Sequence, residues 1–192
     1  MANHLPPTPT DPTDAGAWKR WLDAVFAGNP GRRRHLELAH TTALLLCGGV
    51  AGEDAPVLGR AALLHDIGRT VDLPDTVPHA LSGAFMLREA GLERESRLVA
   101  HHSGADLDAT LRGCGPMVVG WPRDDPDLEA VLTWIDAVSG PDGEHVSPAE
   151  RLAGIEARYG AGSREARVFA SHACQIEHGA RLARIWSRGL VG

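Results

Sequence analysis

Histidine and aspartate residues are the groups in this chain whose types and spacing could do chemistry. His65 and Asp66 are adjacent in the segment LLHDIG, after an alanine and leucine run that predicts a buried helix. Burying a polar, chargeable pair is unfavourable unless both groups have partners. A metal ion is a partner for both, because imidazole and carboxylate groups bind divalent transition metals. The pair is therefore a candidate metal site.

Further candidate ligands occur along the chain, on other predicted helices. They are, in order, His35, His79, His101, His102 and Asp136. His35 precedes the His65–Asp66 pair, and the other four follow it. Helical bundles build interior metal sites from side chains on several helices in this way. The set is large enough for two metal ions, and Asp66 could bridge them.

The histidines outside this set are predicted to have structural roles. His40 shares a predicted helix with His35, and we expect it to pack beside the site rather than to bind metal. The others are predicted to be packing or surface residues: His4, His145, His172 and His178.

Arginines flank two of the candidate ligands and could bind phosphate. Arg32, Arg33 and Arg34 immediately precede His35, and Arg69 follows the HDIG turn. A forked guanidinium matches the oxygens of a phosphate group. The alternative for the three consecutive arginines is a solvated face at a helix start. We treat all four as candidate substrate-binding residues.

The order H…HD…H…HH…D, with HDIG intact, resembles the HD-domain metal-dependent phosphohydrolase superfamily over roughly residues 30–140. The resemblance implies a first metal whose ligands are His35, His65, Asp66 and Asp136. It also implies that Asp66 bridges to a second metal. The ligands of that second metal would be His79 and either His101 or His102.

The resemblance further implies an enzyme that hydrolyses a phosphomonoester or phosphoanhydride of a small molecule, such as a nucleotide or sugar phosphate. One or two divalent metals, foremost Fe or Mn with Zn, Ni, Co or Mg as alternatives, would lower the pKa of a water near Asp66 so that hydroxide attacks phosphorus. Arg69 would stabilise the developing charge. A histidine not used as a ligand, with His101 as the candidate, would protonate the leaving group.

Two other functions stay open. Mixed-valence di-iron oxygenases of the same fold share the six-ligand set, although HHSGADLDATL replaces the run that the phosphonate-cleaving members carry. Arg69 also stands where HD-type nucleotidases place a catalytic glutamate. The third function is a metal-stabilised binding or regulatory module without turnover. The complete ligand set disfavours that third function.

The elements that must position these residues are predicted to be helices. Apolar residues recur at helical spacing from Ala17 onward, and no segment sustains the alternation of a strand. Asp54, Asp125 and Ser147 are predicted N-caps, the last in a capping box with Glu150. Residues 113–126 form the longest expected loop and could be a lid that carries Trp121. The expected helices cover 17–28, 31–49, 54–66, 79–91, 93–104, 126–138, 147–160 and 163–188.

We therefore expect an all-α, compact single-domain helical bundle of the HD-domain type. Residues 1–16, which are rich in proline, should form a flexible N-terminal arm. Residues 17–192 should form the HD domain with a C-terminal helical extension. The exposed face of the last helix could support a homodimer.

Composition excludes several classes of protein. The net charge of −6, from 19 basic and 25 acidic residues, lacks the basic excess of proteins that bind nucleic-acid polymers. No apolar run is long enough to span a bilayer, and the N-terminus lacks the features of a signal peptide. Three widely separated cysteines do not predict a disulfide framework. We expect a cytoplasmic protein whose partner is a small phosphate-containing substrate.

Overall fold

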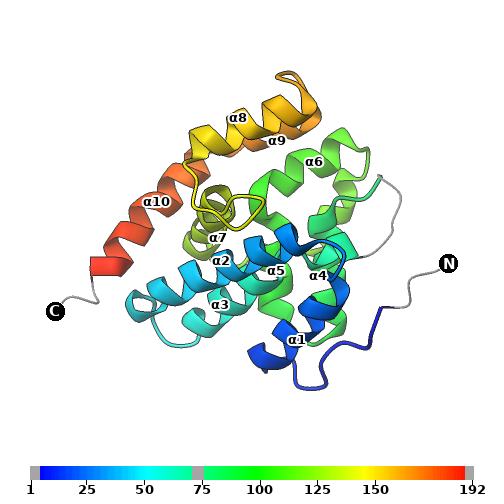
Figure 1. The fold of residues 1–192 in the computed structure, drawn as a ribbon, viewed down its shortest axis with the longest axis vertical. Helices are drawn as coiled ribbons and strands as arrows, with labels where there is room; N and C mark the ends of the chain where they lie inside the picture. The colour runs from blue at the N-terminus through cyan, green and yellow to red at the C-terminus, as the bar shows by residue number, and fades with distance from the viewer. Residues whose placement is uncertain (1–4, 71–75, 189–192) are drawn as a thin grey trace.

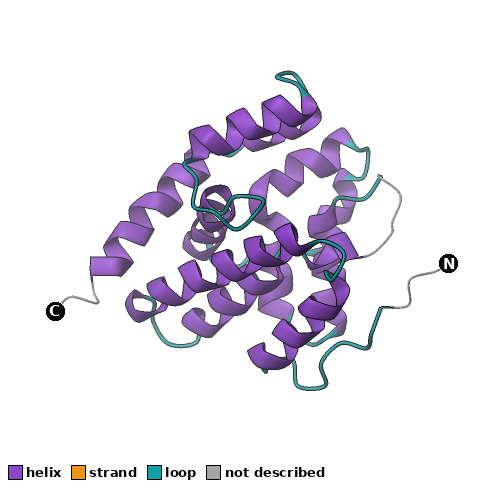
Figure 2. Cartoon of the chain, in the orientation of Figure 1, coloured by secondary structure: helices purple, strands orange, loops and turns teal. Residues whose placement is uncertain are grey.

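The fold consists of helices joined by short connections, in a computed structural model that describes residues 5–70 and 76–188 (Figures 1 and 2). No strand occurs among these residues, so the all-α prediction is confirmed. None of the helices in this part of the chain has the length and apolarity to cross a bilayer. The α-helices are α1 (Ala15–Val25), α2 (Pro30–Leu46), α3 (Asp54–Leu64), α4 (His79–Glu89), α5 (Glu93–His101), α6 (Ala105–Leu111), α7 (Pro126–Val138), α8 (Pro148–Tyr159), α9 (Arg164–Ser171) and α10 (Ala173–Arg188).

Side-chain caps start several helices where the sequence predicts them. Asp125 accepts hydrogen bonds from the first backbone N–H groups of α7. Ser147 and Glu150 form the predicted capping box at the start of α8. Asp54 differs from its prediction as the N-cap of α3: it is the first helical residue, and Glu53 precedes it without a side-chain bond. The acidic Asp54 side chain lies in the first turn, where the helix dipole favours it.

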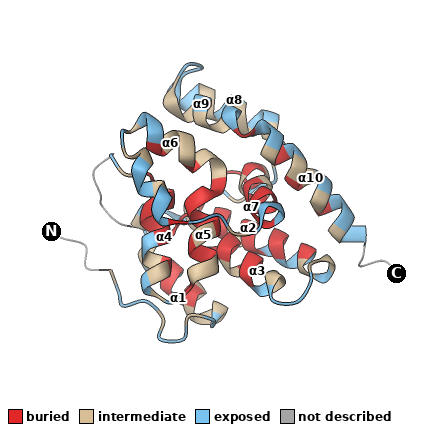
Figure 3. Cartoon of the chain, turned by 180° about the vertical axis from the view of Figure 1, so that it is seen from behind, coloured by how far each residue is buried: buried red, intermediate tan, exposed pale blue. Residues whose placement is uncertain are grey.

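The buried core lies where α2, α3, α4, α5 and α7 meet (Figure 3). One cluster joins α2, α3 and α7 and extends to α10, and a second joins α1 to α2, α3 and α5. Leu63 and Leu64 at the end of α3 are fully buried in the second cluster. The end of α3 is thus held in the interior, and the polar residues that follow it are buried as well.

The N-terminal arm, which the sequence predicts to be flexible, contacts the bundle at two points. The indole N–H of Trp18 donates to the carbonyl of Pro12 at 3.0 Å, and that of Trp21 donates to the carbonyl of Pro6 at 2.9 Å. Leu5 packs against the same cluster as these tryptophans. A buried indole N–H needs an acceptor, and the arm supplies it. Residues 1–4 of the expected arm lie outside the described residues.

Three local predictions differ from the structure. The expected helix 163–188 is broken at His172 into α9 and α10, because α9 turns toward α6 while α10 packs along α7. Residues 105–111 form α6, a helix that the sequence does not predict. The expected lid residue Trp121 is buried, and its indole N–H donates to Ser96 Oγ at 2.7 Å.

Candidate metal centre

The end of α3 delivers His65 and Asp66 to the interior, and the HDIG turn then packs tightly on α4. A Cβ on Gly68 would lie 1.9 Å from the carbonyl oxygen of His79 and 2.5 Å from the amide nitrogen of Gly83. Only glycine permits this close approach. This packing brings the start of α4 close to the residues that follow α3. His79 Nε2 therefore lies 3.0 Å from Asp66 Oδ1.

Three buried histidines have the same hydrogen-bonding arrangement. The Nδ1 atom of His35 lies 3.0 Å from the carbonyl of Ser139, that of His65 lies 2.9 Å from Ala62, and that of His102 lies 2.6 Å from Val99. A carbonyl can only accept, so each Nδ1 carries the proton and each Nε2 presents a lone pair. These backbone contacts therefore fix the orientation of the three rings and leave their Nε2 atoms available to a metal ion.

The Nε2 lone pairs of these rings face one another in the centre. His35 Nε2 lies 3.0 Å from His65 Nε2, an arrangement that needs a proton or a cation between two acceptors. His102 Nε2 is buried and has no hydrogen-bond partner among the described residues. Such an atom is unfavourable unless a ligand satisfies it. The donor set therefore fits a divalent transition metal.

The candidate ligands form three overlapping groups, and in each group one donor atom per residue lies within 4.8 Å of the others. His65, Asp66 and His102 each belong to two of the groups, so the groups adjoin one another. The groups are His35, His65 and Asp66; His65, His102 and Asp136; and Asp66, His79 and His102.

Arginines and a serine hold the two carboxylates of the centre. Arg32 and Arg69 both form ion pairs with Asp66. Burial would raise the pKa of Asp66, but the two arginines outweigh it and hold that pKa well below its ordinary value. The Ser103 hydroxyl donates to Asp136 Oδ2. Asp66 is therefore a carboxylate at neutral pH.

The imidazoles of the third group, His79 and His102, are neutral at physiological pH. Burial is the largest cause that lowers the pKa of His102, to about 3. Burial and the Arg69 guanidinium lower the pKa of His79. A metal ligand must be the neutral imidazole. The environment thus keeps both rings in the form that binds metal.

The structure does not bring His101, which the sequence predicts as a ligand or catalytic residue, into the ligand groups. Its Nδ1 lies 3.0 Å from Asp106 Oδ1, and its Nε2 lies 2.7 Å from the carbonyl of Trp121. Both ring nitrogens are therefore occupied away from the centre. Consecutive residues of a helix point to different sides, and at the end of α5 the residue that points inward is His102.

Of the four candidate phosphate-binding arginines, the structure places two at the centre. Arg32 and Arg69 line the pocket beside Asp66. Arg33 instead pairs with Asp23 and Glu37, and Arg34 pairs with Asp142, so the structure does not bring these two predicted substrate-binding residues to the pocket. Successive residues of α2 are turned by about 100°, so three consecutive side chains cannot share one face.

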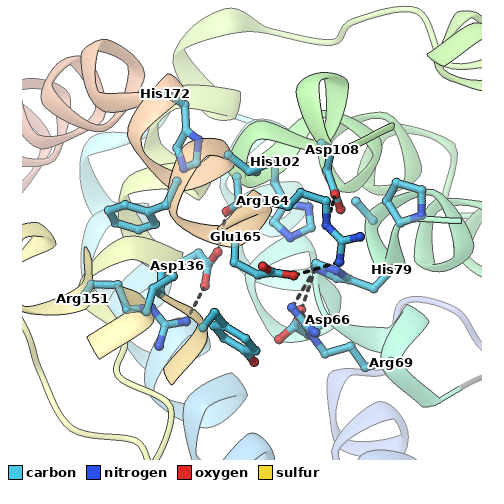
Figure 4. A pocket seen from close by; sticks show the side chains of 18 of the residues that line it. Asp66, Arg69, His79, His102, Asp108, Asp136, Arg151, Arg164, Glu165 and His172 are labelled. Carbon is cyan, nitrogen blue, oxygen red and sulfur yellow. Dashed lines mark hydrogen bonds and ion pairs between the residues drawn. The ribbon is translucent and has the colours of Figure 1, made fainter. Parts of the chain in front are cut away.

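A pocket of about 340 Å³ opens over the centre. Asp66, His79, His102 and Asp136 form its floor, and Figure 4 shows Arg151, Arg164, Glu165 and His172 around it. These four come from α8, α9 and the residue that follows α9. The pocket falls within the range of small-molecule sites, about 300–1,000 Å³.

Sequence analysis missed the residues that cover the pocket, and it missed Ser103. His172, predicted as a packing or surface residue, is buried and also lines the pocket. The available signal was the spacing of Arg151, Ile155 and Arg158, which puts them on one face of α8.

His40 lies outside the ligand groups, as the sequence predicts. Its Nδ1 donates to the carbonyl of Gly59 at 2.9 Å, which ties α2 to α3. The ring is buried, and burial is the largest cause that lowers its pKa. His40 therefore supports the packing of two helices that carry ligands.

A helical bundle with an interior cluster of histidines and aspartates is a fold of the metal-dependent hydrolase type. The family model of the HD domain matches residues 33–140. This is more than half of the chain, so the protein belongs to the HD domain family. No curated protein and no solved structure matches the chain. The match ends before α8. The helices α8 and α9, which form the cover of the pocket, therefore lie outside the matched residues.

Proposed function

We propose that this protein is a metal-dependent hydrolase that cleaves a phosphomonoester or phosphoanhydride of a small molecule. The observation that carries the proposal is the convergence of three oriented Nε2 atoms and two carboxylates on a pocket that arginines line. Histidine and carboxylate ligands bind transition metals. Arginines bind the oxygens of phosphate.

The residues of the centre have distinct tasks in this proposal. His35, His65, His79, His102, Asp66 and Asp136 would hold one or two divalent metals, foremost Fe or Mn. Bound metal supplies activation of water and neutralisation of phosphate charge. Arg32 and Arg69, fixed by Asp66 between them, bind and orient the non-bridging oxygens of the phosphate. The α8 and α9 helices shield the site from bulk water.

The arginine lining favours this function over the two alternatives. A di-iron oxygenase would use the same ligands but has no general need for phosphate-binding cations. A non-catalytic module has no need for a complete ligand set. Both alternatives are outcomes of the experiment below.

The test is elemental analysis of protein purified without chelator, together with assays on nucleotide and sugar phosphates. We expect about two transition metals per chain and release of phosphate. In His79→Ala we expect about one metal, because His79 belongs to only one ligand group. His178→Ala is the matched control, since His178 pairs with Asp127 at an exposed position.

Each contrary result has a defined meaning. One metal in both the native protein and His79→Ala would disprove the two-metal site. Metal without phosphate release from any substrate would disprove the hydrolase proposal. Consumption of O₂ by the iron form would establish the oxygenase instead.

A further inference from the structure

The cover of the pocket differs in chemical character from its floor. On α8, Arg151, Ile155 and Arg158 follow one another at four- and three-residue spacing and all line the pocket. No residue of α8 is buried. The face that α8 turns to the pocket is therefore not required for a packed core, and its composition reflects what enters the pocket.

The pocket has an excess of positive charge before any metal is counted. Among the described residues, six arginines and four carboxylates line it. Three of the arginines, Arg151, Arg158 and Arg164, come from α8 and α9, whereas these helices contribute one carboxylate, Glu165. A reacting phosphate at the floor already has Arg32 and Arg69 beside it. Arg164 pairs with Asp108 and Glu165, and Arg151 lies near Asp136, so Arg158 is the arginine of the cover that has the chemistry to bind additional negative charge.

The positive charges of α8 lie along the axis of the helix, from the floor of the pocket outward. Arg151 Nη2 lies 3.9 Å from Asp136 Oδ1, so this end of the helix is at the floor. Arg158 lies two helical turns further on, which is about 10 Å along the helix axis. Ile155 lies between the two arginines, and Val168 and Phe169 face the same pocket from α9. Two cationic ends are thus separated by an apolar stretch.

We propose that the substrate carries a second anionic group, and that Arg158 binds this group at about 10 Å from the reacting phosphorus, a distance set by the rise of α8. The proposal rests on the proposed function, because it places the reacting phosphate at the metal centre. The carbon skeleton between the two anions lies against Ile155, Val168 and Phe169. A five-carbon skeleton with a phosphate ester at each end has this length. Arg158 is accordingly a specificity-determining residue.

The test uses non-hydrolysable phosphonates and measures binding by calorimetry on the protein as purified. Heptane-1,7-diyl bisphosphonate, in which CH2 groups replace the two ester oxygens of the five-carbon bisphosphate, should bind at least about tenfold more tightly than heptylphosphonate. Propane-1,3-diyl bisphosphonate has the same charge but is too short, so it should show no such gain. In Arg158→Gln the gain of the longer bisphosphonate should disappear, while heptylphosphonate binds as before. Arg184→Gln removes an exposed arginine outside the pocket and should preserve the gain.

The contrary outcomes separate this proposal from the proposed function. Equal binding of heptylphosphonate and the longer bisphosphonate, with hydrolysis of pentyl phosphate, would overturn the second anionic site alone. If the short bisphosphonate showed a gain of the same size, affinity would depend on the total charge of the ligand and not on the position of its second anion. That result would also overturn the second anionic site. The same loss for all three ligands in Arg158→Gln would contradict its positional role. Binding of no phosphonate, with no phosphate ester hydrolysed, would overturn both proposals.

Discussion

At the scale of single residues, Ser103 is the position where the backbone and the centre are most closely linked. It has a φ of 52°, and it is the only non-glycine residue with positive φ among those described. Its hydroxyl donates to Asp136, and its backbone N–H donates to Thr133 Oγ1 at 3.3 Å. A left-handed conformation in a residue with a side chain costs about 1–3 kcal/mol. The contacts with α7 offset that cost and fix the orientation of the Asp136 carboxylate.

Replacement of Ser103 by alanine should weaken metal binding while the fold stays intact. The Asp136 carboxylate would lose the donor that orients it, and loss of such a contact lowers metal affinity by about 10–100-fold. The measurement is competition for metal with a chelator of known affinity. Ser171→Ala is the matched control, since Ser171 is exposed and donates only within its own helix. Equal affinity in Ser103→Ala and the native protein would assign Ser103 to the turn alone.

At the scale of helices, Arg94 ties three elements together. It lies on α5, donates to Asp54 at the start of α3 and forms a two-oxygen contact with Asp124 before α7. Burial would raise the pKa of Asp124, but its bonds with Arg94 outweigh this, and the net shift is downward. His65 directly follows α3, His102 directly follows α5, and Asp136 lies on α7. The contact of Arg94 with Asp54 and Asp124 therefore helps to fix the positions of these three candidate ligands relative to one another.

Asp124→Asn should reduce the free energy of unfolding by about 1 kcal/mol at pH 7. This is below the roughly 1.5–3 kcal/mol of a charge-assisted hydrogen bond, because the Arg94 side chain is 37% exposed and solvent screens the pair. The folded pKa of Asp124 lies below the unfolded one, so its contribution is present above about pH 4 and is lost as pH falls through the folded value. Urea unfolding from pH 7 down to pH 3 should show the variant and the native protein converging.

The matched control for this prediction is Asp142→Asn. Asp142 pairs with Arg34 at 3.3 Å, but the side chains are 72% and 56% exposed. Exposed pairs contribute little, so we expect a change below about 0.5 kcal/mol at either pH. A constant difference between Asp124→Asn and the native protein across the pH range would show that packing, not charge, accounts for the effect.

At the scale of the whole molecule, the contact between α10 and α7 joins the C-terminal helices to the helix that carries Asp136. Gly179 lies at this contact: a Cβ there would lie 2.1 Å from the carbonyl oxygen of Ala130 and 2.8 Å from Trp134 Cβ. The two backbones can approach this closely only because Gly179 has no side chain. Since α9 is directly followed by α10, this contact also anchors the cover of the pocket.

Gly179→Ala should destabilise the protein by about 1–3 kcal/mol, because the added methyl group forces α10 away from α7. Gly154→Ala on α8 is the matched control with the opposite sign, since no atom lies within 4 Å of its new Cβ. Alanine should there stabilise the helix by about 0.4–1 kcal/mol. Thermal and urea unfolding of both variants measure the difference. Equal effects of the two substitutions would contradict the close packing at Gly179.

The sequence alone determined the helical fold class and most of the candidate ligands. Helical spacing of apolar residues and the caps at Asp125 and Ser147 are local signals, and they act within a few residues of the chain. The HDIG segment is also local: a buried helix end followed by Gly68 dictates how His65 and Asp66 enter the interior. The residues His35, His79, His102 and Asp136 were found from their order, which the family resemblance supplied.

The tertiary structure decided what depends on helix rotation and on contacts distant in sequence. Order along the chain could not separate His101 from His102, because the roll of α5 about its own axis fixes which ring faces inward. The same is true of Arg32 against Arg33 and Arg34 on α2. The placement of α8 and α9 over the pocket could not be predicted from the sequence either, since the break at His172 arises from the packing of α10 on α7. Local patterns fix the elements, and only long-range packing fixes which of their faces meet.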